Sequence, residues 1–457
     1  MADLNRFTLK NLELSNYRCF PELALHFHDR VTVFVAPNGG GKTAVLDGVV
    51  AALRLFVDTM EGRTASKGFD PSDIRLVLSP ENKMEHVTPV RLRALGQFLG
   101  RDIVWARERH SAEASRTTTA EAQDLKEFAS RLVVENQEWA QGKAPTAPLF
   151  PLISYYGTGR LWSSGKLTES KRTHETAPNA RHRGYTDCLS SSSHYKYFID
   201  WFRRFSYEAR QEKVAGMASP HRPQEPLGAV QKAVNTVLRP SGWHTLEWDF
   251  AEDRVRASHD IFGRLPVDSL SDGIRNMIGL VADIAHRAAR LNPHLGENAA
   301  TSTPGMVLID EVDMHLHPEW QQVVLQSLQD AFPLVQFIVT THSPQVLTSI
   351  HAENIRILGQ RDGEWEVVVP TYNPYAHRSM DALEEIMGTS AQPQKLSLVE
   401  DFREYQRLVG NAQQDTQRAR ELREKLEREW GPADHELQKL DIAIRKHTAL
   451  RKANGDR

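Results

Sequence analysis

A glycine-rich segment between two apolar stretches carries the strongest chemical signal in this sequence. It reads Ala36-Pro-Asn-Gly-Gly-Gly-Lys-Thr43, after the apolar run Val31–Ala36 and before an apolar segment with helical spacing at 44–56. Closely spaced glycines let backbone N–H groups converge on phosphate oxygens, and the start of the next helix adds positive potential. A glycine-rich turn without function would not need a buried strand before it and a helix after it. The residues expected to bind nucleotide phosphates are Asn38, Gly39, Gly40, Gly41, Lys42 and Thr43.

Two carboxylates supply the second part of the predicted chemistry. They end the apolar run Val307-Leu-Ile-Asp-Glu311. In nucleotide hydrolysis at such loops, the lysine contacts the β- and γ-phosphates, while a threonine and an aspartate hold Mg²⁺. We therefore assign Lys42 to phosphate, Thr43 and Asp310 to the metal, and Glu311 to polarising the attacking water. An apolar strand ending in two acids is common by itself, and only the upstream loop makes the assignment specific.

Two further segments resemble the remaining parts of ABC-type ATPases. Leu270-Ser-Asp-Gly273 opens a predicted helix at 274–287, as the LSGGQ-type signature does, although an ordinary serine N-cap explains the match nearly as well. The resemblance assigns Ser271 and Gly273 to the γ-phosphate bound by a partner protomer. Phe337-Ile-Val-Thr-Thr-His342 ends a strand with a histidine similar to the switch histidine that senses this phosphate, whereas a lone histidine there is otherwise structural. The four segments occur in the ABC order.

The composition is that of a globular protein and excludes several classes. The chain has 457 residues, 40% of them hydrophobic, and 56 basic residues against 59 acidic ones give a net charge of −3. Neither a disordered chain nor a strongly basic nucleic-acid-binding protein fits these values. Two cysteines cannot form a disulfide framework or a cysteine-only zinc site. The first residues lack the apolar core of a signal peptide, and no apolar run is long enough to span a membrane, so we expect a cytoplasmic protein.

The pattern of strands and helices places these motifs in one α/β head interrupted by insertions. We expect a hairpin at 90–108, a helix at about 120–141, and α/β alternation from 269 to 358. Two apolar stripes separated by Gly431-Pro432 predict a C-terminal helical hairpin. The expected divisions are an N-terminal lobe with the phosphate loop (1–56), an insertion (57–148), a core strand (149–162), a helical and loop insertion (163–264), a C-terminal lobe with signature, carboxylates and switch histidine (265–380), and the hairpin (381–457).

Five segments together carry a family resemblance. They are Asn16–Phe20, the phosphate loop, Tyr155–Trp162, Ile309–Gln321 and Thr340–Gln345. On these segments the sequence resembles the RecF/SMC-like ABC ATPases of Septu-type and retron-associated phage-defence systems, over roughly 1–56, 149–162 and 265–372. The resemblance implies an ABC-type P-loop NTPase head, in which helices flank a mixed sheet, with an inserted α+β region. It also implies hydrolysis of ATP with Mg²⁺.

The same resemblance implies catalytic roles and partners. Lys42, Glu311 and His342 would be the catalytic residues, and the D-loop at 314–318 would place His315 and His317 at a dimer interface. Two histidines at i and i+2 also suggest a metal site, but they lack a third ligand in the sequence. The protein would form a homodimer or a higher even oligomer around ATP and control an HNH-type nuclease. In retron systems a reverse transcriptase with its RNA and DNA would join them. The chain itself shows no nuclease motif.

Alternative functions remain open at this point. A stand-alone RecF-like DNA-repair ATPase would bind duplex DNA through the insertions. Its candidate contacts are Lys171, Arg172, Arg181 and Arg183 in the predicted loop 163–183, and Arg91, Arg93 and Arg101 in the hairpin. Salt-dependent DNA binding would support it, although basic runs of this kind usually face solvent. A transporter subunit is a third class, which the large insertions disfavour. The C-terminal hairpin either packs on the head or presents a groove to a partner.

Overall fold

One sheet contains the strands that lead into the phosphate loop, the two carboxylates and the switch histidine. The computed structural model describes residues 6–63, 66–113, 117–159, 180–191, 195–215, 222–390, 392–393 and 395–453. The strand order is β15 (Glu364–Val368), β14 (Ile355–Arg361), β3 (Val31–Val35), β13 (Val335–Thr340), β12 (Gly305–Ile309) and β8 (Leu152–Tyr156). All neighbours run parallel except β14 and β15. Strands β3, β8, β12 and β13 are buried along their whole length, which explains their continuous apolar sequences.

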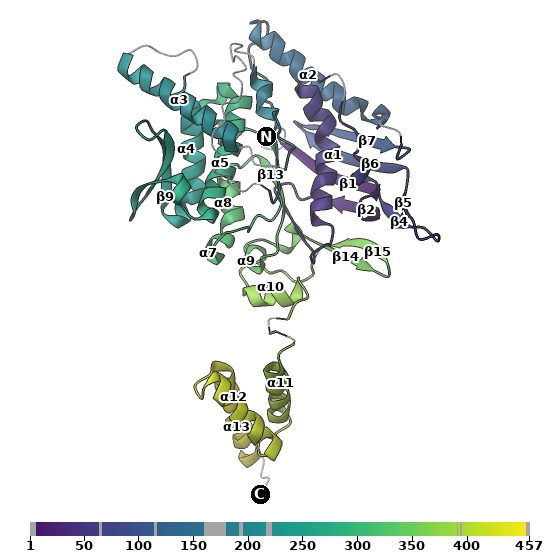
Figure 1. The fold of residues 1–457 in the computed structure, drawn as a ribbon, viewed down its shortest axis with the longest axis vertical. Helices are drawn as coiled ribbons and strands as arrows, with labels where there is room; N and C mark the ends of the chain where they lie inside the picture. The colour runs from purple at the N-terminus through teal and green to yellow at the C-terminus, as the bar shows by residue number, and fades with distance from the viewer. Residues whose placement is uncertain are drawn as a thin grey trace. The chain divides into compact units, whose positions relative to one another are not determined.

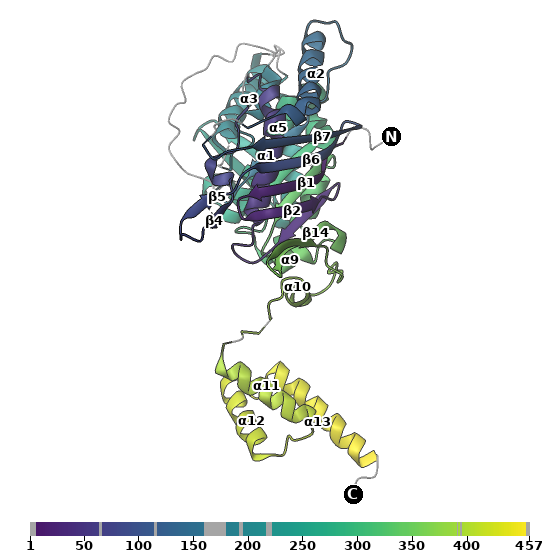
Figure 2. The ribbon, with the colours of Figure 1, turned by 90° about the vertical axis from the view of Figure 1, so that its right-hand side faces the viewer.

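A second, antiparallel sheet packs against the helix that follows the phosphate loop (Figures 1 and 2). Its strand order is β2 (Phe20–His26), β1 (Phe7–Tyr17), β6 (Val90–Phe98) and β7 (Arg101–Arg109). Helix α1 (Lys42–Met60) contacts both sheets, so apolar residues occupy most of its circumference. A Cβ added to its Gly48 would lie 3.2 Å from the methyl groups of Leu14. This arrangement confirms the predicted α/β fold and places the start of α1 beside the motif-bearing strands.

The first insertion extends the antiparallel sheet. Its elements are the 3₁₀ helix η2 (Pro71–Asp73), the ribbon of β4 (Leu76–Leu78) and β5 (Met84–His86), β6, β7, the 3₁₀ helix η3 (Ala120–Ala122) and helix α2 (Gln123–Ala140). The predicted hairpin and helix of this region are therefore both present. Helix α2 packs against α1, where the ring centroid of Phe128 lies 6.1 Å from that of Phe56. The insertion thus shares the core of the head.

The second insertion leads directly into the predicted signature. Its described elements, with the helix that follows, are η4 (Ala180–Tyr185), α3 (Tyr195–Ala215), α4 (Gln224–Leu238), η5 (Arg239–Ser241), β9 (Trp243–Asp249), β10 (Arg254–His259), β11 (Gly263–Pro266), η6 (Val267–Ser269) and α5 (Asp272–Leu291). Strands β11, β10 and β9 form a three-stranded antiparallel sheet in that order. The predicted loop is wrong at its end, because Arg181 and Tyr185 are buried within η4. Residues 163–179 lie outside the described part of the chain.

Short helices connect the strands of the mixed sheet and lead out of it. They are η7 (Pro293–Asn298), α6 (Ala299–Ser302), α7 (Pro318–Gln321), α8 (Val324–Ala331), α9 (Pro344–Leu347), η8 (Ala352–Asn354) and α10 (Ser379–Glu385). Helices α7 and α8 follow β12 and the predicted D-loop, and α9 follows β13 and His342. Among the described residues, no helix is long and apolar enough to cross a membrane.

The C-terminal unit has a core of its own. The chain divides into the units Met1–Ala382 and Leu383–Arg457, and the second contains α11 (Ser397–Gly410), α12 (Gln417–Trp430) and α13 (His435–Ala453). The predicted hairpin, α12 and α13, is present but incomplete, because α11 packs against both helices. The sequence indicates helix through most of 381–457 but does not predict α11 as a third member of this core, although its buried residues recur at helical spacing. The core consists of Phe402, Tyr405, Val409, Ala419, Leu422, Leu426, Leu437 and Leu440.

Candidate active site

The carboxyl ends of three parallel strands bring the predicted catalytic segments together. Strand β3 continues into the phosphate loop, β12 ends directly before Asp310, and β13 ends two residues before His342. In the sheet, β13 lies between β3 and β12. Because the carboxyl ends of parallel strands meet at one edge of a sheet, the loop, the carboxylates and the histidine lie along the same edge.

Glycine is required at consecutive positions of the phosphate loop. Gly39 and Gly41 have φ angles of 76° and 79°, in the left-handed region that glycine adopts most readily. A Cβ added to Gly40 would lie 2.7 Å from the Cβ of Ala36, and one added to Gly41 would lie 2.6 Å from the ring of Phe20. The backbone is therefore packed too closely for other side chains, as expected of a loop that presents N–H groups to phosphate.

The Lys42 ammonium group folds over this loop. Its Nζ donates hydrogen bonds to the backbone carbonyls of Ala36 (2.8 Å) and Pro37 (3.3 Å). Burial lowers the pKa of Lys42, and the nearby carboxylates of Asp310 and Glu311 oppose that shift. Hydrogen bonds to charged partners are stronger than those to neutral carbonyls, so a phosphate is the better ligand for this cation.

Thr43 and Asp310 meet where the metal is predicted. The Thr43 hydroxyl donates to Oδ2 of Asp310 over 2.8 Å, although the two residues are 267 positions apart in the chain. Asp310 is buried, and its Oδ1 accepts a hydrogen bond from Thr340 (2.6 Å). Mg²⁺ prefers oxygen ligands such as these, so the pair fits the metal that ATP chemistry requires. When bound, Mg²⁺ would neutralise charge on the β- and γ-phosphates.

Thr340 holds both carboxylate residues in place, although sequence analysis does not single it out. Its side chain is fully buried, donates to Asp310, and accepts a hydrogen bond from the backbone N–H of Glu311 (2.7 Å). Glu311 has a φ of 51°, a left-handed conformation that is uncommon for a residue with a side chain. The Thr340 hydroxyl therefore stabilises the turn that positions Glu311 after β12.

The predicted switch histidine follows a second threonine contact. The Thr341 hydroxyl donates to Asp313 over 2.5 Å and accepts a hydrogen bond from the backbone N–H of Ser343 (2.9 Å). His342, between these residues, is half-buried. Contacts from the end of β13 thus connect the segment that contains His342 to the acidic segment 310–313 after the neighbouring strand.

The predicted signature segment packs on the predicted D-loop of the same chain. Ser271 is the N-cap residue of α5, is exposed, and makes no capping hydrogen bond with its side chain. Two residues later, a Cβ added to Gly273 would lie 2.3 Å from the carbonyl oxygen of His315, which requires glycine at this position. The signature segment therefore has an exposed hydroxyl on one side and a close backbone contact to the D-loop on the other.

The two D-loop histidines do not assemble a metal site with other described residues. His315 and His317 are exposed, and the ring of His317 accepts a hydrogen bond from the Glu319 N–H at the start of α7 (3.4 Å). Across the described ranges, no group of three or more His, Cys, Asp or Glu side chains could hold a metal ion. The described structure therefore gives no support to a metal site at these histidines. Their exposure is compatible with the predicted dimer interface, which requires accessible side chains.

Two family models match overlapping parts of the chain. One, described as AAA domain, matches residues 11–213, and the other, described as AAA domain, putative AbiEii toxin, Type IV TA system, matches residues 166–348. The first match contains the phosphate loop. The second contains the signature, the carboxylates and the switch histidine.

Three relatives then identify the group. The retron Vc95 probable ATPase of Vibrio cholerae serotype O1 biovar El Tor is 25% identical over 473 residues, which cover 93% of this chain and 88% of that protein. The retron Ec83 probable ATPase of Escherichia coli is 37% identical over 184 residues, 40% of this chain and 32% of its own. The Septu protein PtuA of Bacillus mycoides strain KBAB4 is 38% identical over 92 residues, 20% and 12% of the two chains. The chain is an ATPase similar to those of the retron and Septu group.

Solved structures similar to this ATPase include SMC heads. The SMC head domain from Thermotoga maritima has a TM-score of 0.43 and 16% identity, over 80% of this chain and 99% of that one. The Smc head bound to the C-winged helix domain of ScpA has a TM-score of 0.45 and 15% identity, over 79% and 97% of the two chains. The likeness concerns the fold alone.

A charge network next to the phosphate loop of the ATPase fixes α1 to neighbouring segments. Arg18 forms ion pairs with Asp47, one turn after Thr43 in α1, and with Asp73 of η2 (3.1 Å). Burial raises the pKa of the Asp47 carboxyl, and the Arg18 guanidinium opposes this shift. Burial and the nearby Asp47 raise the pKa of the Tyr155 hydroxyl, which hydrogen-bonds to Asp47. The network joins β8, α1 and the first insertion behind the phosphate loop.

The prediction that Arg181 contacts nucleic acid is wrong. Its side chain is only 4% exposed and donates to the carbonyls of Leu291 (2.7 Å) and Pro148 (2.6 Å). The guanidinium also lies 4.1 Å from the centroid of the Phe150 ring. These contacts connect η4 to the core of the head, and they leave Arg181 no surface for a phosphate.

The other basic candidates receive little support from the described structure. Lys171 and Arg172 lie outside the described residues, and Arg183 is half-buried. In the hairpin, Arg91 and Arg93 form ion pairs with nearby glutamates. An arginine that is already paired contributes less to phosphate binding, so the duplex-DNA alternative loses part of its basis.

Proposed function

We propose that two copies of this ATPase enclose two ATP molecules, and that the state of the nucleotide controls an associated nuclease. The phosphate loop, Asp310 and Glu311 of one copy would face Ser271 and Gly273 of the other. The observation that supports this arrangement is the unused N-cap of α5, whose exposed Ser271 makes no side-chain capping bond. A helix N-terminus with an available hydroxyl is a suitable ligand for a γ-phosphate.

Within each copy, the residues of the phosphate-loop half would bind and hydrolyse ATP. Lys42 would contact the β- and γ-phosphates, while Thr43 and Asp310 would hold the metal. Glu311 would accept the proton of the attacking water, because it directly follows Asp310 and its backbone is held by Thr340. The low exposure of Asp310 would keep competing water away from the metal ligands.

The switch histidine would report the presence of the γ-phosphate. His342 ends the segment after β13 that Thr341 ties to Asp313. Departure of the phosphate would change the contacts of His342, and the Thr341 contact would pass this change to the D-loop that begins after Asp313. The D-loop packs on Gly273, so the signature offered to the other copy would respond as well.

The mass of the protein in solution tests the composite site. Glu311→Gln should be dimeric in saturating Mg-ATP and monomeric without nucleotide, because dimerisation and ATP binding would be linked. Adding Ser271→Arg should give a monomer that still binds ATP. The matched control is Thr301→Arg on α6, an exposed position that should leave the dimer intact. A Glu311→Gln protein that binds Mg-ATP and stays monomeric would overturn the proposal.

The partner that we propose is an HNH-type nuclease, joined in retron systems by a reverse transcriptase with its RNA and DNA. The family resemblance supports the nuclease, and the separate core of α11–α13 supports the C-terminal unit as its attachment site. Affinity purification of the tagged chain from its native host with Mg-ATP should recover a stoichiometric nuclease.

Removal of residues 395–457, which contain α11–α13 and leave α10 whole, should release that nuclease and leave ATP binding intact. Recovery of the nuclease with the truncated chain would refute attachment through the C-terminal unit. A dimer that carries only DNA would favour the RecF-like alternative, and its affinity for DNA should then decrease steeply with salt.

A further inference from the structure

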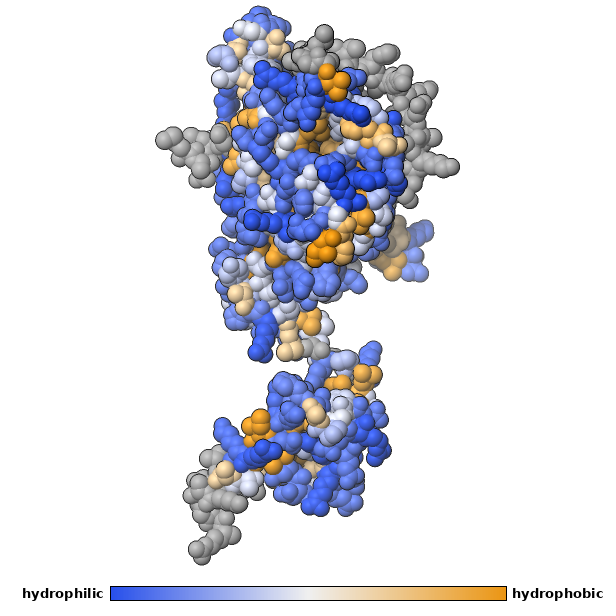
Figure 3. Space-filling view, turned by 90° about the vertical axis from the view of Figure 1, so that its left-hand side faces the viewer, coloured by the Kyte–Doolittle hydropathy of each residue, from blue (hydrophilic) through white to orange (hydrophobic). Residues whose placement is uncertain are grey.

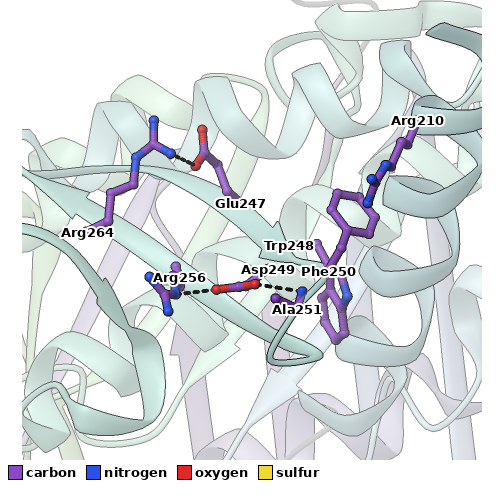
Figure 4. Close-up of a pocket in the computed structure, with 8 residues that line it drawn as sticks. All are labelled: Arg210, Glu247, Trp248, Asp249, Phe250, Ala251, Arg256 and Arg264. Atoms are coloured by element: carbon purple, nitrogen blue, oxygen red, sulfur yellow. Dashed lines mark hydrogen bonds and ion pairs between the residues drawn. The ribbon is translucent and has the colours of Figure 1, made fainter. Parts of the chain in front are cut away.

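A pocket of the head lies between α3 and the sheet of β9, β10 and β11, which are not part of the ATP-site sheet. Its volume is about 530 Å³. Its lining consists of Arg210, Glu247, Trp248, Asp249, Phe250, Ala251, Arg256 and Arg264 (Figure 4). Figure 3 shows the side of the molecule on which α3 and β9 are drawn in Figure 1. Hydrophilic residues dominate the surface on this side. The pocket therefore suits a charged or hydrogen-bonding ligand.

β9 lies at the edge of its sheet and contributes residues to this pocket. Within the described residues, β9 pairs only with β10. The side chain of Gln231 on α4 occupies one position of the edge, because its Oε1 accepts from the Leu246 N–H (2.9 Å) and its Nε2 donates to the Leu246 carbonyl. Backbone groups alternate in direction along a strand, so the N–H and C=O of Trp248 face the same way as those of Leu246. Residues 247–251, from the end of β9 and the turn after it, line the pocket consecutively.

One arginine of the pocket retains an uncompensated charge. Arg256 and Arg264 form ion pairs with carboxylates of β9, at 2.7 and 3.2 Å. Arg210 pairs with no carboxylate in the described part of the chain, and its guanidinium lies over the ring of Phe250, 4.5 Å from the centroid (Figure 4). An aromatic ring orients a cation without neutralising it, so Arg210 can still bind an anion.

Trp248 adds a second donor at the same wall. The residue is 6% exposed, and its indole Nε1 is buried with no acceptor among the described residues. Buried polar groups are almost always hydrogen-bonded, so an orphaned indole N–H in a pocket wall indicates an absent acceptor. Arg210 and Trp248 are thus a charged and a neutral donor among the residues that line the pocket.

We propose that this pocket binds an acidic, extended segment of a partner protein. The segment would pair with the backbone of Trp248 along the free edge of β9, and one of its carboxylates would accept hydrogen bonds from Arg210 and from the Trp248 indole. Arg256 and Arg264 are already paired with carboxylates, which disfavours a nucleic-acid strand, whose successive phosphates need several unpaired cations. Since β11 leads through η6 to Ser271, the bound segment would adjoin the sheet that ends at the signature.

Indole resonances of the full-length protein provide the test. The chain is labelled with ¹⁵N-tryptophan, the Trp248 signal is assigned with Trp248→Phe, and the probe is an acetylated pentapeptide with two glutamates between valines. The acidic peptide should shift the Trp248 signal at millimolar concentration. Its glutamine counterpart should bind at least about tenfold more weakly, because it cannot form the charged hydrogen bond.

Variants of α3 supply the controls. Arg210→Gln should weaken binding of the acidic peptide by about tenfold, and Arg210→Lys should retain part of it. Arg203→Gln should have no effect, because Arg203 is already paired with Asp253 (2.9 Å). An unmoved Trp248 signal, or equal shifts from both peptides, would overturn the proposal. A shift caused by oligothymidylate or inorganic phosphate instead of the peptide would also overturn it and assign the pocket to phosphate ligands.

Discussion

The two halves of the proposed ATP site are built in opposite ways. In the phosphate-loop half, Thr43, Asp310 and Thr340 satisfy one another's hydrogen bonds, and Lys42 already rests on carbonyls of its own loop. In the signature half, Ser271 is exposed and its side chain makes no capping bond. The first half is organised before a ligand arrives, whereas the second presents an unused group at the start of a helix. Binding of the nucleotide and completion of the site should therefore be separable steps.

Removal of the proposed catalytic carboxylate should give the largest effect and should affect only hydrolysis. We expect Glu311→Gln to lower kcat by about 10²–10⁴-fold, the usual contribution of a general base. The affinity for ATP should persist, because Lys42 and Thr43 are unchanged. Single-turnover hydrolysis and calorimetric ATP binding measure the two quantities. Glu81→Gln, at an exposed glutamate, is the control. Full activity of Glu311→Gln would exclude this residue as the base.

A methyl group added at Gly273 should impair the signature half of the site and leave the phosphate-loop half intact. In Gly273→Ala the new Cβ would meet the His315 carbonyl at 2.3 Å, so α5 or the D-loop must move. A displacement of about 1 Å costs roughly 10²-fold in rate when geometry matters, and we expect that loss in kcat with unchanged ATP binding. Gly359→Ala in β14 is the matched control, since an added Cβ there has no neighbour within 4 Å. Loss of ATP binding in Gly273→Ala would show that the halves are not separable.

Loss of the Thr340 hydroxyl should slow hydrolysis in the phosphate-loop half without preventing nucleotide from binding there. We expect Thr340→Val to lower kcat by about 10-fold or more and to raise the Mg²⁺ requirement, because outer groups that orient ligands typically contribute this much. Thr340→Ser keeps the hydroxyl and should restore most of the rate. Thr8→Val is the control, because the buried Thr8 hydroxyl has no partner in the described structure. Equal kinetics of Thr340→Val and the unmodified enzyme would assign Thr340 a packing role only.

Acid should destabilise α5, the helix that begins after Ser271, and this effect should be the smallest. Burial lowers the pKa of His286 to about 4, from an ordinary value of 6.5, and its ring packs on Trp201. Between these values the unfolded chain binds a proton that the folded protein does not, so stability falls as pH decreases from 6.5 towards 4. The loss should reach at most about 3 kcal/mol. Thermal unfolding from pH 7 to pH 4 measures it, and His286→Phe should flatten the slope. An unchanged pH dependence in His286→Phe would show that groups other than His286 cause the loss of stability in acid.

Features that depend on adjacent residues could be predicted, and those that depend on distant contacts could not. The strand, loop and helix around Gly39–Gly41 follow from local spacing, and so does the buried strand before Asp310. No local pattern marks Thr340, because its role depends on Asp310, 30 positions earlier in the chain. Neighbouring parallel strands are separated by whole helices in sequence, so their contacts leave little local trace.

Composition was misleading where burial decided the role of a residue. Arg181 stands in a polar, basic stretch, and this context predicts exposure. Its partners, Leu291 and Pro148, are 110 and 33 positions away, and they draw it into the core. The third member of the C-terminal core was missed for a different reason, because only the packing of α11 against both α12 and α13 shows that the hairpin is incomplete without it.

The contact of Gly273 with His315 has a consequence for the response to ATP concentration. Glu311 and His315 are only four residues apart, so the segment that follows the proposed catalytic carboxylate contacts the helix that would face the other nucleotide. In the proposed dimer, each ATP would therefore influence the affinity for its counterpart, and by linkage the influence must be mutual. Such an enzyme would respond to the square of the ATP concentration at low occupancy. Its activity would therefore rise steeply over a narrow range of ATP concentration, and not in proportion to it.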